Sequence, residues 1–117
     1  MVEILAIIRP QKLSETKKKL IETGYPGFTC HKAMGRGKKP VAFLLADGTS
    51  IRTDLVGKRM LNIMVPDEAE DDVVKAIIEV NSTGNPGDGK LFVMPIEKSY
   101  RVRNRMLDND ESEVKAE

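Results

Sequence analysis

The order in which two hydrophobic periodicities alternate along the chain constrains its fold more than any other feature. Apolar residues occupy every second position over 2–9, as in a strand, and then recur at helical spacing. Ser14 is expected to be the N-cap of the first helix, and Gly24 is expected to end it. A second strand is expected over 27–34. The first part of the sequence therefore predicts a strand, a helix and a strand.

The same order returns after a long interruption. Residues 35–57 follow neither periodicity, whereas 58–65 reads as a strand and 91–96 as another. A helix is expected between these strands, with Asp67 as its cap. The residues expected on the buried face of this helix are Val73, Val74, Ile77, Ile78 and Val80.

Two strand–helix–strand units of similar length predict an α+β fold of the ferredoxin-like, double βαβ type. In this fold two helices cover one face of a four-stranded antiparallel sheet. The other face needs a cover, and association with other copies is expected to supply it. Hydrophobic residues make up 40% of the 117 residues, which is enough for one domain with a thin core. One domain is therefore expected over 1–107, followed by an acidic tail over 108–117.

Charge and composition exclude several functional classes. The net charge of +1 indicates neither a nucleic-acid partner nor a membrane surface, and three Phe and two Tyr are too few for base stacking. The tail over 108–117 carries five acids and one lysine, which leaves eighteen bases and thirteen acids in the rest. That body is expected to attract an anion. The N-terminal apolar run is too short for a leader or a membrane span, so a cytoplasmic protein is expected.

No set of residues predicts catalysis or metal binding. Cys30 is the only cysteine and His31 the only histidine, and neighbours on a strand point to opposite faces. A joint metal site is therefore not expected, and Cys30 has no base to activate it. A single cysteine also fits a reducing cytoplasm. The sequence predicts that the protein is not an enzyme.

Three clusters rich in glycine or in basic residues lie just outside strand ends. Residues 83–90 contain three glycines and Lys90, residues 35–39 form a second cluster, and the arginines at 101, 103 and 105 would share one side of an extended segment. The sequence of residues 84–90 is nearly that of a phosphate-binding P-loop. However, this segment connects a helix to a strand, whereas a P-loop connects a strand to a helix, so a Walker-type nucleotidase is not expected. The three clusters favour a polyphosphate ligand. A turn-rich connector and a solvated surface are the alternatives.

These motifs together resemble the PII nitrogen-signalling family. The resemblance rests on I-x-A-I-I-R-P-x-K-L at 4–13, G-x-G at 35–37, V-P-D at 65–67, T-G-x-x-G-D-G-K-L-F-V at 83–93 and R-x-R at 101–103. Within the family the chain is most similar to the PII-like proteins of nitrogen-fixation gene clusters in methanogenic archaea.

The resemblance implies a trimeric assembly that binds ATP or ADP in clefts between subunits, with 2-oxoglutarate as an effector. Lys58 and Lys39 are implied for 2-oxoglutarate. Magnesium is uncertain, because position 39 is commonly a glutamine in the family and a lysine cannot ligate the ion. The residues implied for the nucleotide are Ile7, Thr29, Gly35, Gly37, Lys38, Met64, Gly87, Asp88, Gly89, Lys90, Arg101 and Arg103.

The resemblance also implies a regulatory output. A long T-loop (about 37–57) would act on a partner, while a B-loop (83–90) would hold phosphates. The expected partners are identical or paralogous subunits and a nitrogenase component, which the protein would inhibit according to nitrogen status. The alternatives are a PII protein that regulates an ammonium channel and a phosphoryl-transfer enzyme. The apolar run at 41–46 is expected to bind the partner, or else to form a hairpin arm with Asp47-Gly48 as its turn.

Overall fold

The computed structural model describes residues 1–36, 41–44, 46–53 and 55–107. Its strands are β1 (Val2–Ile8), β2 (Thr29–Gly35), β3 (Val41–Leu44), β4 (Ser50–Thr53), β5 (Val56–Val65) and β6 (Lys90–Pro95). Its helices are α1 (Leu13–Thr23) and α2 (Glu70–Asn81), each preceded by a 3-10 turn, η1 (Pro10–Lys12) and η2 (Asp67–Ala69).

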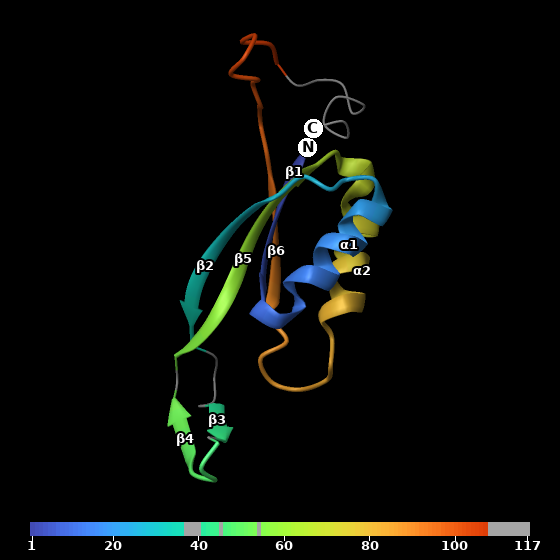
Figure 1. The fold of residues 1–117 in the computed structure, drawn as a ribbon. Coiled ribbons are helices and arrows are strands. Elements are labelled where there is room, and N and C mark those ends of the chain that lie inside the picture. The colour runs from blue at the N-terminus through green and yellow to red at the C-terminus, as the bar shows by residue number, and fades with distance from the viewer. Residues whose placement is uncertain (37–40, 45, 54, 108–117) are drawn as a thin grey trace.

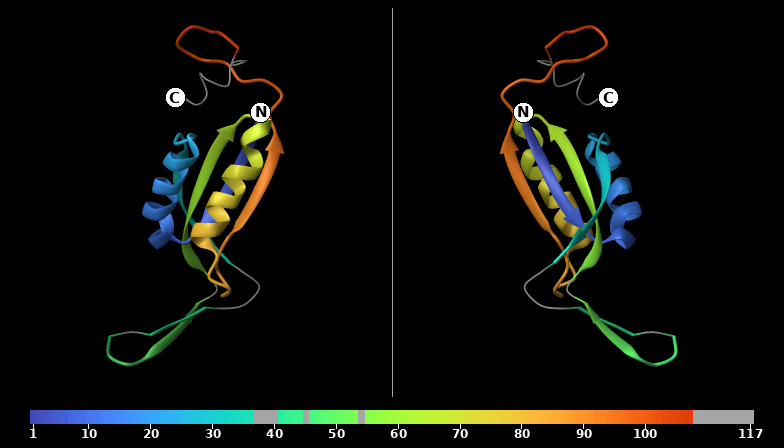
Figure 2. Two further views of the ribbon diagram at one scale, coloured as in Figure 1. Left: turned by 90° about the vertical axis from the view of Figure 1, so that its right-hand side faces the viewer. Right: turned by 90° about the vertical axis from the view of Figure 1, so that its left-hand side faces the viewer.

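Four strands form the main sheet in the order β2-β5-β1-β6, and every pairing in it is antiparallel. Both helices lie on the same face of this sheet (Figures 1 and 2). The ferredoxin-like fold predicted from the sequence is therefore confirmed. The predicted acidic tail lies outside the described residues.

The core lies between the sheet and the two helices. Along β1 the residues Val2, Ile4, Ala6 and Ile8 are buried, and the residues between them are half-buried. This alternation has the period of two that a strand imposes, so one face of β1 belongs to the core. The other core side chains come from β5 and the helices, namely Leu20, Leu61, Ile63, Val65, Ala69, Val73 and Ile77.

The structure corrects both predicted helix starts. Ser14 lies inside α1 and is exposed, because Pro10 begins a 3-10 turn that runs directly into the helix. Proline has the φ angle of a first helical turn and needs no N–H partner there. Asp67 lies inside η2, and its carboxylate accepts a hydrogen bond of 2.8 Å from the amino group of Met1. Gly24 ends α1 as predicted, with φ 88°.

The predicted buried face of α2 is correct only in part. Val73 and Ile77 are fully buried, but the side chain of Ile78 is 51% exposed, so that prediction is wrong. Ala76 and Asn81 are buried instead, because a helix turns through 3.6 residues and places them on the same stripe as Val73 and Ile77. Val74 and Val80 are half-buried.

The long loop contains a hairpin. Strands β3 and β4 pair with each other in a separate two-stranded sheet, which extends beyond the end of the main sheet (Figure 1). Asp47 makes its turn by accepting hydrogen bonds from the backbone N–H (3.0 Å) and the hydroxyl (2.7 Å) of Thr49. Gly48 supplies the positive φ of 90°. The loop therefore contains the hairpin with Asp47-Gly48 as its turn, and the binding of a partner to the run at 41–46 stays a prediction. In the described part of the chain, no helix is long and apolar enough to cross a membrane.

Candidate functional site

The B-loop is folded around the carboxylate of Asp88. This carboxylate accepts hydrogen bonds from the hydroxyl and the backbone N–H (2.8 Å) of Thr83 and from the backbone N–H of Gly84 (3.0 Å). Arg9 adds an ion pair of 2.7 Å from the end of β1. The hydroxyl of Thr83 and these other donors hold the pKa of Asp88 well below its usual range. The side chain is therefore ionised, and its hydrogen bonds hold the loop in the shape that the structure shows.

Two glycines bring the B-loop close to β1 and its neighbours. Gly87 has φ 97° and Gly89 has φ 113°, a backbone region that side-chain-bearing residues rarely adopt. A Cβ atom at Gly89 would also overlap the carbonyl oxygen of Ile7. Position 89 therefore requires glycine for two independent reasons, its backbone angle and the adjacent strand.

Two cations hold the carbonyl groups of the B-loop. Arg9 donates to the Pro86 carbonyl at 3.0 Å, and the ammonium group of Lys58 donates to the Gly87 carbonyl at 2.7 Å. Burial lowers the pKa of Lys58, the positive charge of Arg9 lowers it further, and Asp88 opposes both effects. Because Lys58 stands near the start of β5, it connects the B-loop to the base of the T-loop.

Arg9 is a site residue that the sequence reasoning missed. Its partners Pro86 and Asp88 lie 77 and 79 residues away, so no local pattern relates them. The available signal was its position directly after β1, beside the strand that the B-loop enters. A charged residue that ends a central strand faces whatever loops gather at that edge of the sheet.

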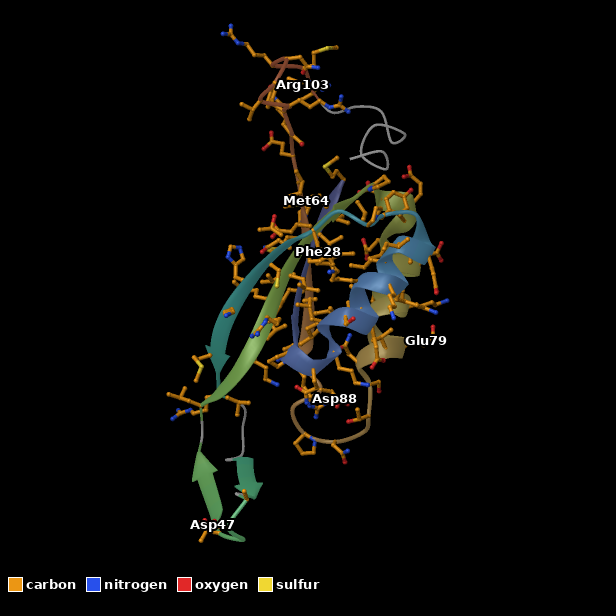
Figure 3. All side chains as sticks on the ribbon, viewed as in Figure 1. Phe28, Asp47, Met64, Glu79, Asp88 and Arg103 are labelled. Atoms are coloured by element: carbon orange, nitrogen blue, oxygen red, sulfur yellow. The ribbon has the colours of Figure 1, made fainter. Side chains whose placement is uncertain are left out.

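The structure separates the residues predicted for the nucleotide and for 2-oxoglutarate into two groups. Figure 3 shows Asp88 at one end of the sheet and Met64 and Arg103 toward the other. Lys58 and Met64 are six positions apart on β5, which corresponds to roughly 20 Å. The residues at the B-loop end are Ile7, Gly35, Gly87, Asp88, Gly89, Lys90 and Lys58, and those in the other half are Thr29, Met64, Arg101 and Arg103. Gly37, Lys38 and Lys39 lie outside the described residues.

The arginine cluster does not have its predicted conformation. The Arg105 N–H donates to the Arg101 carbonyl at 2.8 Å, and the Arg101 N–H donates to the Met106 carbonyl at 2.8 Å. The segment therefore turns back on itself, so the extended conformation in which the three arginines would share one side is not the one found. The side chain of Asn104 helps to close the turn, because its oxygen accepts from the Met106 N–H at 3.0 Å.

A cavity of about 380 Å³ lies between the end of α2 and the first residues of β6. Ile78 is one of its walls, which explains why this residue is not covered by the core. A mostly apolar hollow of this volume beside Lys90 is large enough for a small organic molecule. The lining residues are Ile7, Ile8, Ile77, Ile78, Asn81, Ser82, Asp88, Gly89, Lys90 and Leu91.

Comparison with known proteins assigns the chain to a family. Residues 1–106 match the family model described as Nitrogen regulatory protein P-II. The chain belongs to the P-II family. The P-II match includes the B-loop, the T-loop and the arginine segment, and it confirms the resemblance inferred from the sequence motifs. A P-II protein is a member of a nitrogen-regulatory signalling family rather than of an enzyme family.

Similar P-II proteins come from archaea. The Nitrogen fixation nifHD region GlnB-like protein 2 of Methanobacterium ivanovii is 39% identical, over 94% of this chain and 98% of the relative. The protein of the same name from Methanococcus maripaludis is 41% identical, over 88% of this chain and 93% of the relative. Nitrogen regulatory protein GlnK2 of Haloferax mediterranei is 36% identical, over 92% of this chain and 87% of the relative. The expected similarity to proteins of nitrogen-fixation regions in methanogens is confirmed.

Proposed function

We propose that this P-II protein binds ATP or ADP in clefts between the copies of a trimer, senses 2-oxoglutarate beside the nucleotide, and uses its T-loop to inhibit a nitrogenase component. The names of the relatives from Methanobacterium ivanovii and Methanococcus maripaludis, which refer to nitrogen-fixation regions, support the choice of target. The same assembly would respond to nitrogen status because 2-oxoglutarate and the T-loop meet at Lys58.

The observation that carries the proposal is the separation of the candidate ligand residues. Lys90 lies at the B-loop end of the sheet and Arg103 beyond the opposite end (Figure 3). One nucleotide cannot contact both within a single copy, because the sheet alone separates them by roughly 20 Å. A neighbouring copy that places its Arg103 beside Lys90 completes the site. The open face of the sheet provides the surface for that association.

The residues at the B-loop end fit a phosphate group. The positive φ angles of Gly87 and Gly89 allow the main chain to approach a ligand closely, and Lys90 adds a cation. Asp88 contributes through the shape that it gives the loop, because its carboxylate is already bonded to Thr83, Gly84 and Arg9. Lys38 would join the phosphates from the mouth of the T-loop, with Ile7, Thr29 and Met64 beside the base.

Lys58 is the proposed contact for 2-oxoglutarate. In the structure its ammonium group is engaged by the Gly87 carbonyl, so a carboxylate ligand would exchange with that bond. Lys39 would be a second cation for the same ligand. No cluster of carboxylates and histidines that could hold a metal ion occurs among the described residues, and we do not assign magnesium a site.

Calorimetric titration with ATP tests the shared nucleotide site. Replacement of Lys90 or Arg103 by Ala should each weaken ATP binding about 10- to 150-fold, because each removes a charge-assisted hydrogen bond. Replacement of the exposed Lys18 on α1 by Ala is the matched control and should leave the affinity unchanged. Wild-type affinity for ATP in both Lys90→Ala and Arg103→Ala would refute the site assignment. ATP hydrolysis near the median enzyme rate of about 10 s⁻¹ would instead support the phosphoryl-transfer alternative.

A further inference from the structure

The sheet face opposite the helices is not covered by any described element of the chain (Figure 1). The strand register places two neighbouring rows of side chains near its middle. The central row is Asn62, Leu5 and Phe92, and Met64, Glu3 and Met94 form the row beside it. Phe92 is 43% exposed and Met64 is 42% exposed, so apolar surface remains open to solvent. Exposed apolar side chains on an uncovered sheet face are typical of a surface that binds other chains, and the proposed trimer would supply them.

One carboxylate lies within this apolar face. Glu3 stands on the central strand β1, directly between Met64 of β5 and Met94 of β6. Its Oε2 accepts a hydrogen bond of 2.6 Å from the side-chain amide of Asn62, and both residues are half-buried within the single copy. Burial of a carboxylate between two methionines costs free energy unless each carboxylate oxygen has a hydrogen-bond donor. The position of Glu3 thus needs an explanation beyond packing.

The Glu3–Asn62 pair retains both a donor and acceptors for further hydrogen bonds. Within the described residues, Asn62 is the one donor to Glu3, which leaves Oε1 available. The Asn62 amide has two N–H groups and one carbonyl oxygen. One N–H donates to Glu3 Oε2, which leaves the other N–H and Oδ1 available. Each copy therefore has one spare donor and two spare acceptor oxygens, Glu3 Oε1 and Asn62 Oδ1, on the same face. In a closed ring of identical copies, each spare Asn62 N–H can be matched by the Glu3 Oε1 of the next copy.

We propose that the Glu3–Asn62 pair lies inside the interface between copies and selects which chains can share one assembly. This inference rests on the trimeric assembly of the proposed function and adds the residues that decide its membership. A neighbour with the same pair supplies the N–H that Oε1 needs. A neighbour with apolar residues at positions 3 and 62 leaves a carboxylate oxygen and an amide N–H buried without partners. Such a chain is rejected even though its surface is more apolar.

The first experiment measures assembly by mass photometry as a function of protein concentration. It is made without nucleotide, so that contacts of Thr29 and Met64 with a base do not contribute. Asn62→Leu should raise the dissociation midpoint about 10- to 100-fold, because it leaves the Glu3 carboxylate buried and unpaired. The double variant Glu3→Leu, Asn62→Leu should return to the wild-type midpoint or below, because it removes both polar groups. The exposed Gln11, replaced by Leu, is the control.

The second experiment measures selection. Tagged wild-type chains are co-expressed with untagged chains of the double variant, and assemblies recovered through the tag are analysed by mass spectrometry. The untagged variant should be nearly absent, whereas untagged Gln11→Leu chains should be present in proportion to their expression. Recovery of the double variant in the same proportion as Gln11→Leu would overturn the selective role of the pair.

The outcomes separate this inference from the proposed function. A wild-type midpoint for Asn62→Leu, in chains that do assemble, would overturn the buried pair and leave the trimer intact. A double variant that assembles as weakly as Asn62→Leu would also overturn the buried pair and leave the trimer intact. A wild-type protein that is monomeric at every concentration would refute the assembly and the inference with it. Circular dichroism of each variant identifies any loss of assembly that follows from unfolding.

Discussion

The strictest structural requirement of the B-loop is glycine at position 89, and replacement by Ala tests it. The left-handed backbone of Gly89 costs a side-chain-bearing residue about 1–2 kcal/mol. In addition, the new Cβ would overlap the Ile7 carbonyl oxygen and stand 3.1 Å from the Ile7 carbonyl carbon and 3.4 Å from the Ile8 Cα. These are backbone atoms and cannot rotate away. Relief requires the start of β6 to leave β1, which breaks the pairing of Lys90 with Ile7.

The magnitude follows from these two contributions. Loss of the terminal pairing adds about 1–2 kcal/mol, so Gly89→Ala should lower the free energy of unfolding by about 2–4 kcal/mol. For a chain of this length 1 kcal/mol corresponds to a change of about 4 °C in Tm, which gives a decrease of about 8–16 °C. Gly84 also has a positive φ, of 82°, but a Cβ added to it would have no described atom within 4 Å. Gly84→Ala should therefore cost only the backbone contribution, a decrease of about 4–8 °C.

Thermal denaturation by circular dichroism, at one protein concentration for all variants, provides the comparison. Gly57→Ala is a further control, because a Cβ added there would also have no described atom within 4 Å and the φ of Gly57 is not positive. Its Tm should remain within about 2 °C of the wild type, as is usual for substitutions that disturb no contact. Equal Tm values for Gly89→Ala and Gly84→Ala would refute the argument that the Ile7 carbonyl excludes a side chain. ATP affinity should fall in Gly89→Ala even where the fold survives.

Two further predictions concern the B-loop and the T-loop. The hydrogen bonds of Asp88 depress its folded pKa below its unfolded value of about 4, so its stabilisation is present above pH 4 and is lost as the pH falls below it. The difference in Tm between wild type and Asp88→Asn should therefore be largest above about pH 5 and shrink at about pH 2–3, and a difference that is constant over this range would contradict the assignment. Deletion of residues 42–53 should abolish inhibition of the co-purifying target, which an activity assay of that target measures. The ATP affinity and the assembly of the shortened chain should stay intact. Retained inhibition would place the output surface elsewhere.

Much of the fold was predictable because it depends on local periodicity. The alternation along β1, the glycine that ends α1 and the two repeated strand–helix–strand units all lie within short windows of sequence. The helix starts were mispredicted for an equally local reason. Ser14 and Asp67 are polar residues that can cap a helix, and local preference favours them over the prolines that precede them, whereas the structure begins each turn at or just after a proline. Ile78 was mispredicted because an apolar residue can line a cavity as well as a core.

The candidate site was predictable only in its parts. Glycine-rich and basic motifs identified the B-loop and the arginine segment, but no motif could show that Arg9 contacts Asp88, because strands must first bring residues 79 positions apart together. The turn at 101–106 was missed because Asn104 closes it through a hydrogen bond that extended spacing does not reveal. The separation of Lys90 from Arg103 is likewise a property of the sheet and not of the sequence.

The central claim is that one nucleotide site takes Lys90 from one copy and Arg103 from its neighbour, and mixing two defective chains tests it most directly. Lys90→Ala and Arg103→Ala chains, each impaired in ATP binding alone, are co-assembled in equal amounts. A closed trimer that contains both chains has one interface with both residues intact, so about a quarter of all sites should regain wild-type affinity in a calorimetric titration. No recovery of tight binding in confirmed mixed trimers would contradict the claim, because it would mean that both residues act within one copy or that neither binds ATP.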